Sequence, residues 1–120
     1  MITLYAYVDG SDLADLEAGL VKRFTEFVAE WNIPTARVVN VRRQPSAGLR
    51  EGDLPDWNLG LNFTVERLPR HKIQELVRFL SRLAKETGRD FAIGSGGEDW
   101  FSLGPEPRGN VVEQLAEQIG

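Results

Sequence analysis

The order of hydrophobic periodicities along the chain limits its fold more than any other feature of the sequence. Residues 2–8 alternate aliphatic side chains with polar or aromatic ones, which is the period of a strand that buries one face. Apolar residues then recur at steps of three and four from Leu13 to Trp31, and Asn32 and Pro34 follow. This spacing predicts an amphipathic helix that ends at these two residues.

The second part of the chain repeats the change between strand-like and helix-like segments. Residues 36–41 and 59–65 are rich in β-branched and apolar residues, so we expect two strands there. Helical spacing returns between Pro69 and Gly88, and residues 91–93 form a short apolar run. The resulting order of elements predicts an α+β fold of the ferredoxin-like (βαββαβ) type, with an antiparallel sheet and two helices on one face.

The C-terminal part of the chain extends this pattern. Residues 100–103 can add a fifth strand after the glycine-rich turn at 94–97, and residues 110–119 have the cap and spacing of a short C-terminal helix. A helix this short does not persist alone in water, so it must pack on its own sheet or on another subunit. We therefore predict a single α+β domain over residues 1–104, followed over 105–120 by a connector and a helix that docks on the domain or on a partner.

Composition excludes several classes of protein. The chain has no cysteine, which excludes disulfides, thiolate metal ligands and cysteine nucleophiles. No segment approaches the roughly eighteen apolar residues of a membrane span, so we expect a cytoplasmic protein without membrane association. The formal net charge of −4 argues against a nucleic-acid partner, because nucleic-acid-binding proteins usually carry a basic excess.

The charged residues are grouped in blocks. Residues 31–50 contain four Lys or Arg and no Asp or Glu, and residues 67–89 contain seven against two, whereas the other segments are acidic. Either elements of opposite charge lie side by side and neutralise one another, or a surface with both signs steers a charged macromolecular partner. Helical spacing places four residues of the second block on one basic ridge: Arg78, Arg82, Lys85 and Arg89.

Residue types that catalyse reactions or bind metals do not occur at diagnostic spacings. The loop at 94–97 follows a strand, but the acidic residues Glu98 and Asp99 would repel a phosphate, so we interpret it as a hairpin turn. His71 is the only histidine, and its two cationic neighbours disfavour a metal ion. We therefore expect no catalytic residue, no metal ligand and no cofactor.

Tyr5 and Tyr7 should project from the sheet face opposite the helices. The segment LYAYV around them resembles the first-strand motif of RNA recognition motifs, which stack bases on aromatic residues of a sheet. That family would place a basic residue and aromatics on the third strand, whereas this chain has NLGLNFTVE, so we do not expect RNA binding. We expect this face to meet the C-terminal helix or a second subunit instead.

These features favour a non-catalytic protein-binding module, in one form an inhibitor of the immunity or antitoxin type that sequesters a basic effector. Small size, acidic loops and tryptophans beside charged residues support this hypothesis, because such aromatics often anchor interfaces. The predicted partner-binding residues are Asp53, Asp56, Trp57, Glu98, Asp99 and Trp100.

The alternative is a small-molecule-binding or enzymatic dimer with a pocket near the long loop at residues 42–57. Guanidinium groups match the geometry of carboxylates and phosphates, so Arg42, Arg43 and Arg50 would hold an anionic ligand there. A third hypothesis is a structural one, in which the chain is a domain of a larger assembly.

Overall fold

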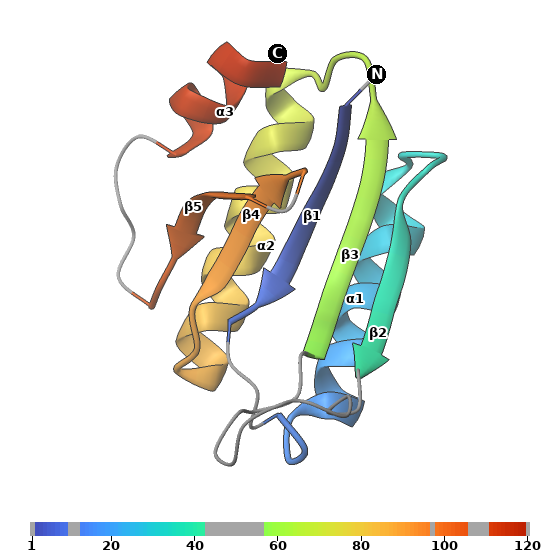
Figure 1. Ribbon diagram of the computed structural model, residues 1–120, viewed down its shortest axis with the longest axis vertical. Coiled ribbons are helices and arrows are strands. Elements are labelled where there is room, and N and C mark those ends of the chain that lie inside the picture. The colour runs from blue at the N-terminus through green and yellow to red at the C-terminus, as the bar shows by residue number, and fades with distance from the viewer. Residues whose placement is uncertain (1, 10–12, 43–56, 97, 106–110, 120) are drawn as a thin grey trace, which may run out of the picture.

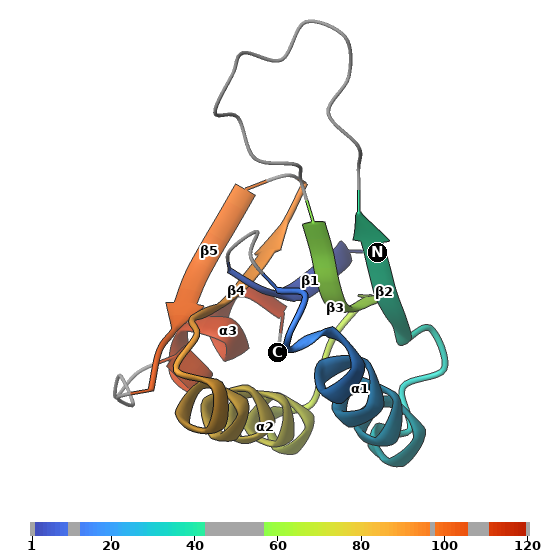
Figure 2. The same ribbon diagram turned by 90° about the horizontal axis from the view of Figure 1, so that it is seen from below.

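A computed structural model describes residues 2–9, 13–42, 57–96, 98–105 and 111–119. In this structure, helices pack on one face of a single sheet, as the two views in Figures 1 and 2 show. The elements in chain order are β1 (Ile2–Val8), α1 (Glu17–Trp31), β2 (Arg37–Arg42), β3 (Trp57–Val65), α2 (Arg70–Thr87), β4 (Phe91–Ser95), β5 (Glu98–Leu103) and α3 (Val111–Ile119).

The sheet has five strands in the order β2-β3-β1-β4-β5, and each strand is antiparallel to its neighbours. This arrangement confirms the α+β class, the antiparallel sheet and the fifth strand. The exact ferredoxin-like topology is not matched, because β5 pairs with β4 and extends the sheet beyond four strands. The fifth strand begins at Glu98, two residues before the predicted start, because the β4–β5 hairpin already pairs Ser95 with Glu98.

The helices begin and end for identifiable reasons. Asn32 at the end of α1 and Gly88 at the end of α2 both adopt the left-handed conformation that commonly terminates a helix. The first helix starts at Glu17 rather than near Leu13, because residues 14–16 form a turn, yet Leu13 is still completely buried. Within the described residues, no helix combines the length and apolar character needed to cross a membrane.

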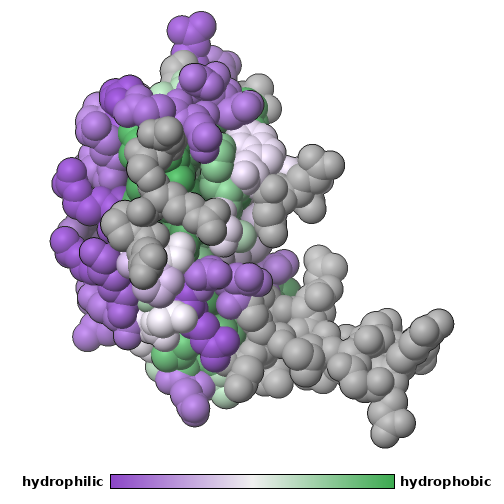
Figure 3. Space-filling model, turned by 90° about the vertical axis from the view of Figure 1, so that its left-hand side faces the viewer, coloured by the Kyte–Doolittle hydropathy of each residue, from purple (hydrophilic) through white to green (hydrophobic). Residues whose placement is uncertain are grey.

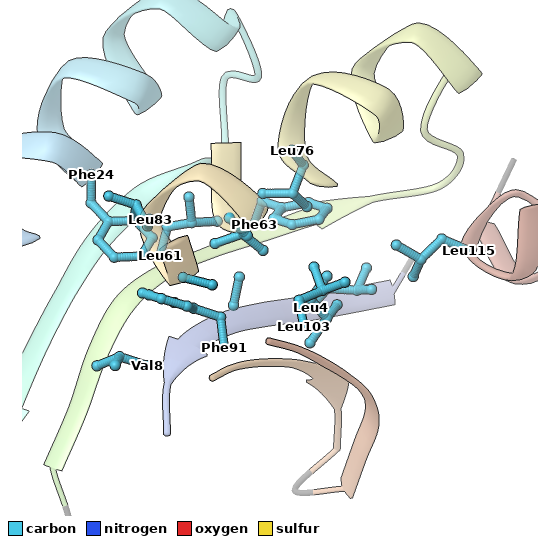
Figure 4. Packing of buried hydrophobic residues seen from close by; sticks show 14 of the residues in the cluster. Leu4, Val8, Phe24, Leu61, Phe63, Leu76, Leu83, Phe91, Leu103 and Leu115 are labelled. Atoms are coloured by element: carbon cyan, nitrogen blue, oxygen red, sulfur yellow. The ribbon is translucent and has the colours of Figure 1, made fainter. Parts of the chain in front are cut away.

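The hydrophobic core lies between the sheet and the helices. Leu4 and Phe63 from the strands and Phe24, Leu76 and Leu83 from the helices point into the same interior (Figure 4). The alternation predicted for the first strand is observed, since Leu4, Ala6 and Val8 of β1 are buried. In the described part of the chain, no polar or charged residue is buried. The core is therefore held together by apolar packing.

The C-terminal helix α3 docks on this chain, beside α2 on the helix side of the sheet (Figure 2). Its buried residues Val111, Leu115 and Ile119 join the hydrophobic core. The Leu68 backbone N–H donates a hydrogen bond to the Ile119 carbonyl at 2.6 Å. Hydrophilic residues cover the helix side, at the left of Figure 3, and hydrophobic residues show between helices and sheet. The expectation that α3 covers the tyrosine face is therefore wrong, because its apolar residues are buried on the opposite side of the sheet.

Candidate functional site

The sheet face opposite the helices is the first candidate site. It faces the reader in Figure 1, and no helix lies over it in either view. Because side chains alternate along a strand, the positions between the buried residues of β1 point to this open face. The central positions of the open face are Thr3, Tyr5 and Tyr7 on β1, paired with Thr64, Asn62 and Gly60 on β3.

An aromatic pair lies at the centre of the open face. The rings of Tyr5 and Tyr7 stack with their centroids 4.8 Å apart and their planes inclined by 24°. On β3, Gly60 lies opposite Tyr7, and on β4, Gly94 lies opposite Tyr5. Neither glycine has a side chain that could cover the rings from the neighbouring strand, and both tyrosines are partly exposed.

The Tyr7 side chain is half-buried and interacts with its neighbour across the strands. Partial burial disfavours the phenolate and raises the pKa of Tyr7, while a side-chain hydrogen bond with Asn62 opposes part of this increase. On the same face, the hydroxyl oxygens of Thr3 and Thr64 are 2.9 Å apart and form a hydrogen bond. The centre of the face therefore combines aromatic rings with uncharged polar groups.

The edge strand β2 continues this surface. Its register places Arg37, Val39 and Val41 opposite the outward positions of β3. Val41 is 48 % exposed, and among the described residues no other large hydrophobic residue is classed as exposed. This surface suits contact with another macromolecule, because it offers aromatic and aliphatic area with hydrogen-bonding groups between.

The structure places the predicted partner-binding residues only in part. Asp53 and Asp56 lie outside the described residues, and for Trp57, Glu98 and Asp99 only the backbone is described, at the starts of β3 and β5. The register aligns Asp99 with Gly94, Tyr5 and Asn62, and Asn62 is five residues from Trp57 on β3. The backbones of Trp57 and Asp99 are therefore separated by about 17 Å along the strands and about 14 Å across them.

Trp100 is the one predicted partner-binding residue whose side chain the structure describes. Its side chain is partly buried and packs against the hydrophobic core, beside the irregular register between Ile93 and Gly94. It therefore contributes to the packing of β5. Whether the predicted clusters around Trp57 and Asp99 meet stays a prediction, because Asp53 and Asp56 lie outside the described residues.

Of the anion-binding residues of the alternative hypothesis, the structure describes Arg42, at the end of β2. Arg42 pairs with Trp57 through the backbone, whereas Arg43 and Arg50 lie outside the described residues. The pocket expected near residues 42–57 consequently stays a prediction.

Charged residues line a hollow between α1 and α2 on the outer side of the helix layer. Its volume is about 310 Å³, and Glu26 and Glu30 of α1 line it together with Arg78 and Arg82 of α2. Nearby, Arg23 forms an ion pair with Glu86 and joins the two helices. Two residues of the predicted basic ridge thus lie beside acidic residues, as the charge blocks suggested.

A second hollow, of about 430 Å³, lies between the start of α1 and the end of α2, and Asp15, Leu20 and Leu83 are among its lining residues. Sequence reasoning missed both hollows, because each combines residues from helices that are distant in the chain. The only sequence signal for the first hollow was the four-residue spacing of Glu26 and Glu30 on one helix, which matches the spacing of Arg78 and Arg82 on the other. Among the described residues, no group of three or more His, Asp or Glu side chains is arranged to hold a metal ion.

Comparisons with known proteins were made at the levels of family, sequence and structure. No family model, no curated protein and no solved structure matches the chain.

Proposed function

We propose that this protein is a non-catalytic protein-binding module and that the open sheet face is its binding surface. The observation that carries the proposal is the stacked, partly exposed aromatic pair of Tyr5 and Tyr7, on the sheet face opposite the helices. Aromatic residues at the centre of a surface, surrounded by uncharged polar groups, are typical of protein interfaces.

The charge of the open face supports a protein partner over RNA. Arg37 is its one basic residue among the described strand positions, and the whole chain carries a net charge of −4. A surface that binds single-stranded nucleic acid needs a basic groove to neutralise the phosphates. Tyr5 and Tyr7 are therefore proposed as contacts with a protein.

One form of this function is an inhibitor of the immunity or antitoxin type, with a basic effector as its partner. The acidic charge of the chain would attract such a partner and would accelerate the encounter. In this form, Asp53, Asp56, Glu98 and Asp99 would contribute acidic contacts with the partner.

We also infer that the six elements from β1 to β4 form a ferredoxin-like unit to which β5 and α3 have been added. The antiparallel order β2-β3-β1-β4 supports this inference. Because such folds host many unrelated functions, the proposed function depends on the open face and not on the fold.

Site-specific photo-crosslinking in cells tests the proposed function. A benzophenone amino acid replaces Tyr5 in one variant and Gln118, an exposed residue of α3, in a matched control. We expect Tyr5 to yield one defined crosslink to another protein and Gln118 to yield none. Crosslinks from Gln118 alone would overturn the proposal.

A second measurement separates binding from folding. The double variant Tyr5→Ser, Tyr7→Ser should lose the crosslinked partner in a pull-down, whereas Gln118→Ser should retain it. Thermal unfolding confirms that both variants are folded. Unchanged capture of the partner by the folded double variant would contradict the role of the open face.

A further inference from the structure

The outer side of α1 and α2 forms a second surface, independent of the open sheet face. Figure 2 shows the two helices side by side on the side of the molecule away from the sheet, with no other element over their outer surfaces. We call this surface the α1–α2 groove. Its lining residues are Arg23, Glu26, Phe27, Glu30, Glu75, Arg78, Phe79 and Arg82.

The floor of the groove is aromatic. Phe27 of α1 and Phe79 of α2 stack with their ring centroids 4.2 Å apart and their planes inclined by 7°. Both side chains are only partly buried. The groove thus has an apolar strip along its centre, between two charged walls.

The two walls carry mainly opposite charges. Contacts between Arg23 and Glu86 and between Trp31 and Lys72 show that the helices run antiparallel. Since Phe27 stacks on Phe79, Glu26 and Glu30 lie within about one helical turn of Arg82 and Arg78 along the groove. Apart from Arg23 on α1 and Glu75 on α2, the α1 wall is therefore acidic and the α2 wall basic.

These four charges have no ion-pair partner among the described residues. The charged neighbours that could have neutralised them are engaged elsewhere, since Glu86 pairs with Arg23 and Glu75 lies 4.0 Å from Lys72. Charges that remain unpaired across a groove are available to a partner with the complementary pattern.

We propose that the α1–α2 groove binds a second copy of this chain and forms a symmetric dimer. A two-fold axis that runs along the groove places the acidic wall of one copy over the basic wall of the other, and the reverse. It also preserves height along the groove, so Glu26 and Glu30 come within about one helical turn of Arg82 and Arg78 of the second copy. The two helices of each copy then form an antiparallel four-helix layer between two sheets.

The second copy fits the groove better than a partner with one sign of charge. A wholly acidic or wholly basic partner would be repelled by one of the two walls, whereas this chain carries both signs at the required spacing. Phe27 and Phe79 of the two copies would form the apolar centre, and the charges would form the rim. The groove surface measures about 22 Å by about 20 Å, which suits a dimer of modest affinity.

Charge reversal of each wall tests the dimer. One variant carries Arg78→Glu and Arg82→Glu, and the other carries Glu26→Arg and Glu30→Arg. Sedimentation equilibrium should show a dimer for the wild type and should show, for each variant alone, a dissociation constant increased at least about tenfold by like-charge repulsion. An equimolar mixture of the two variants should form a heterodimer, because each then provides the charges that the other lacks.

Two controls show that the variants still fold and that the dimer forms through the α1–α2 groove. The substituted residues lie on helix surfaces, and both replacement residues favour helices, so circular dichroism should stay unchanged. The variant Tyr5→Ser, on the open sheet face, should dimerise like the wild type. A wild type that remains monomeric, a mixture that forms no heterodimer, or a dimer abolished by Tyr5→Ser would each overturn the proposal.

Discussion

Trp31 and Lys72 exchange two hydrogen bonds that join the end of α1 to the start of α2. The Trp31 indole N–H donates to the Lys72 carbonyl at 3.1 Å, and the Lys72 ammonium donates to the Trp31 carbonyl. Trp31 is 1 % exposed, and its ring meets the Phe63 ring edge to face, with centroids 5.0 Å apart. The ammonium group of Lys72 also satisfies a carbonyl in the last turn of α1, where the helix dipole favours a cation.

Breaking this reciprocal contact should destabilise the protein. We expect Lys72→Met to lower the free energy of unfolding by about 1 kcal/mol, because it removes a hydrogen bond to a helix end. Trp31→Phe, measured by urea denaturation, should remove the second hydrogen bond and lower the free energy of unfolding by at least about 1 kcal/mol. Lys22→Met, at an exposed position of α1, is the control and should change stability little. Unchanged stability of Lys72→Met would contradict the contribution of its hydrogen bond to the end of α1.

Gly60 allows β3 to pack closely against β1. A Cβ atom at this position would lie 1.9 Å from the Ala6 carbonyl oxygen, and the contact is with rigid backbone. We expect Gly60→Ala to lower the free energy of unfolding by on the order of 3 kcal/mol or more. Gly19→Ala is the matched control, because a Cβ atom there would have nothing within 4 Å and alanine favours the helix by about 0.5–1 kcal/mol. Equal effects of the two substitutions would refute this explanation.

Leu115 anchors α3 through burial, whereas the ion pair between Arg70 and Glu113 lies on the surface. Leu115 is 1 % exposed, and the two charged side chains are each more than half exposed. Leu115→Ala should lower the free energy of unfolding by about 2–5 kcal/mol. Glu113→Gln should leave it unchanged within experimental error, because water screens an exposed ion pair. A larger effect of Glu113→Gln in chemical denaturation would show that the ion pair, and not the apolar contact, holds the helix.

The raised pKa of Tyr7 can be measured by titration at alkaline pH. In the variant Tyr5→Phe, Tyr7 is the only tyrosine, so tyrosinate absorbance follows its ionisation alone. We expect the pKa of Tyr7 to lie above that of free tyrosine, and Asn62→Ala to raise it further by removing the opposing hydrogen bond. Titration of the unfolded protein in urea provides the reference, and a folded pKa at or below this reference would contradict the burial of Tyr7.

The raised pKa of Tyr7 also predicts how the stability of the folded protein changes with pH. Folding favours the neutral phenol, so its contribution to stability is complete below the pKa of unfolded tyrosine and is lost as the pH rises through the higher folded pKa. Tyr7→Phe should therefore reduce the loss of stability at alkaline pH. Unfolding midpoints measured at neutral and alkaline pH check this prediction.

Local patterns predicted most of the elements correctly, because the period of apolar residues reflects how one segment meets the core. The alternation along residues 2–8 matches β1, and the spacing between Pro69 and Gly88 matches α2. Errors occur where distant segments decide the outcome. The first helix begins later than its apolar stripe, because Leu13 is buried from within a turn.

The contrast between local patterns and contacts of distant segments also applies to the candidate sites. The alternation of β1 was enough to place Tyr5 and Tyr7 on the face opposite the helices. The predicted partner-binding residues around Trp57 and Trp100 stay a prediction, because Asp53 and Asp56 lie outside the described residues.

By itself, the sequence determined the α+β class, the apolar face of each main element and the outward position of the two tyrosines, since these depend on residues close together in the chain. Only the tertiary structure decided that α3 packs beside α2, that the sheet gains its fifth strand at β4, and that Glu26 and Glu30 line the same groove as Arg78 and Arg82. These relationships depend on which distant surfaces bury the most apolar area together, and local periodicity does not contain that information.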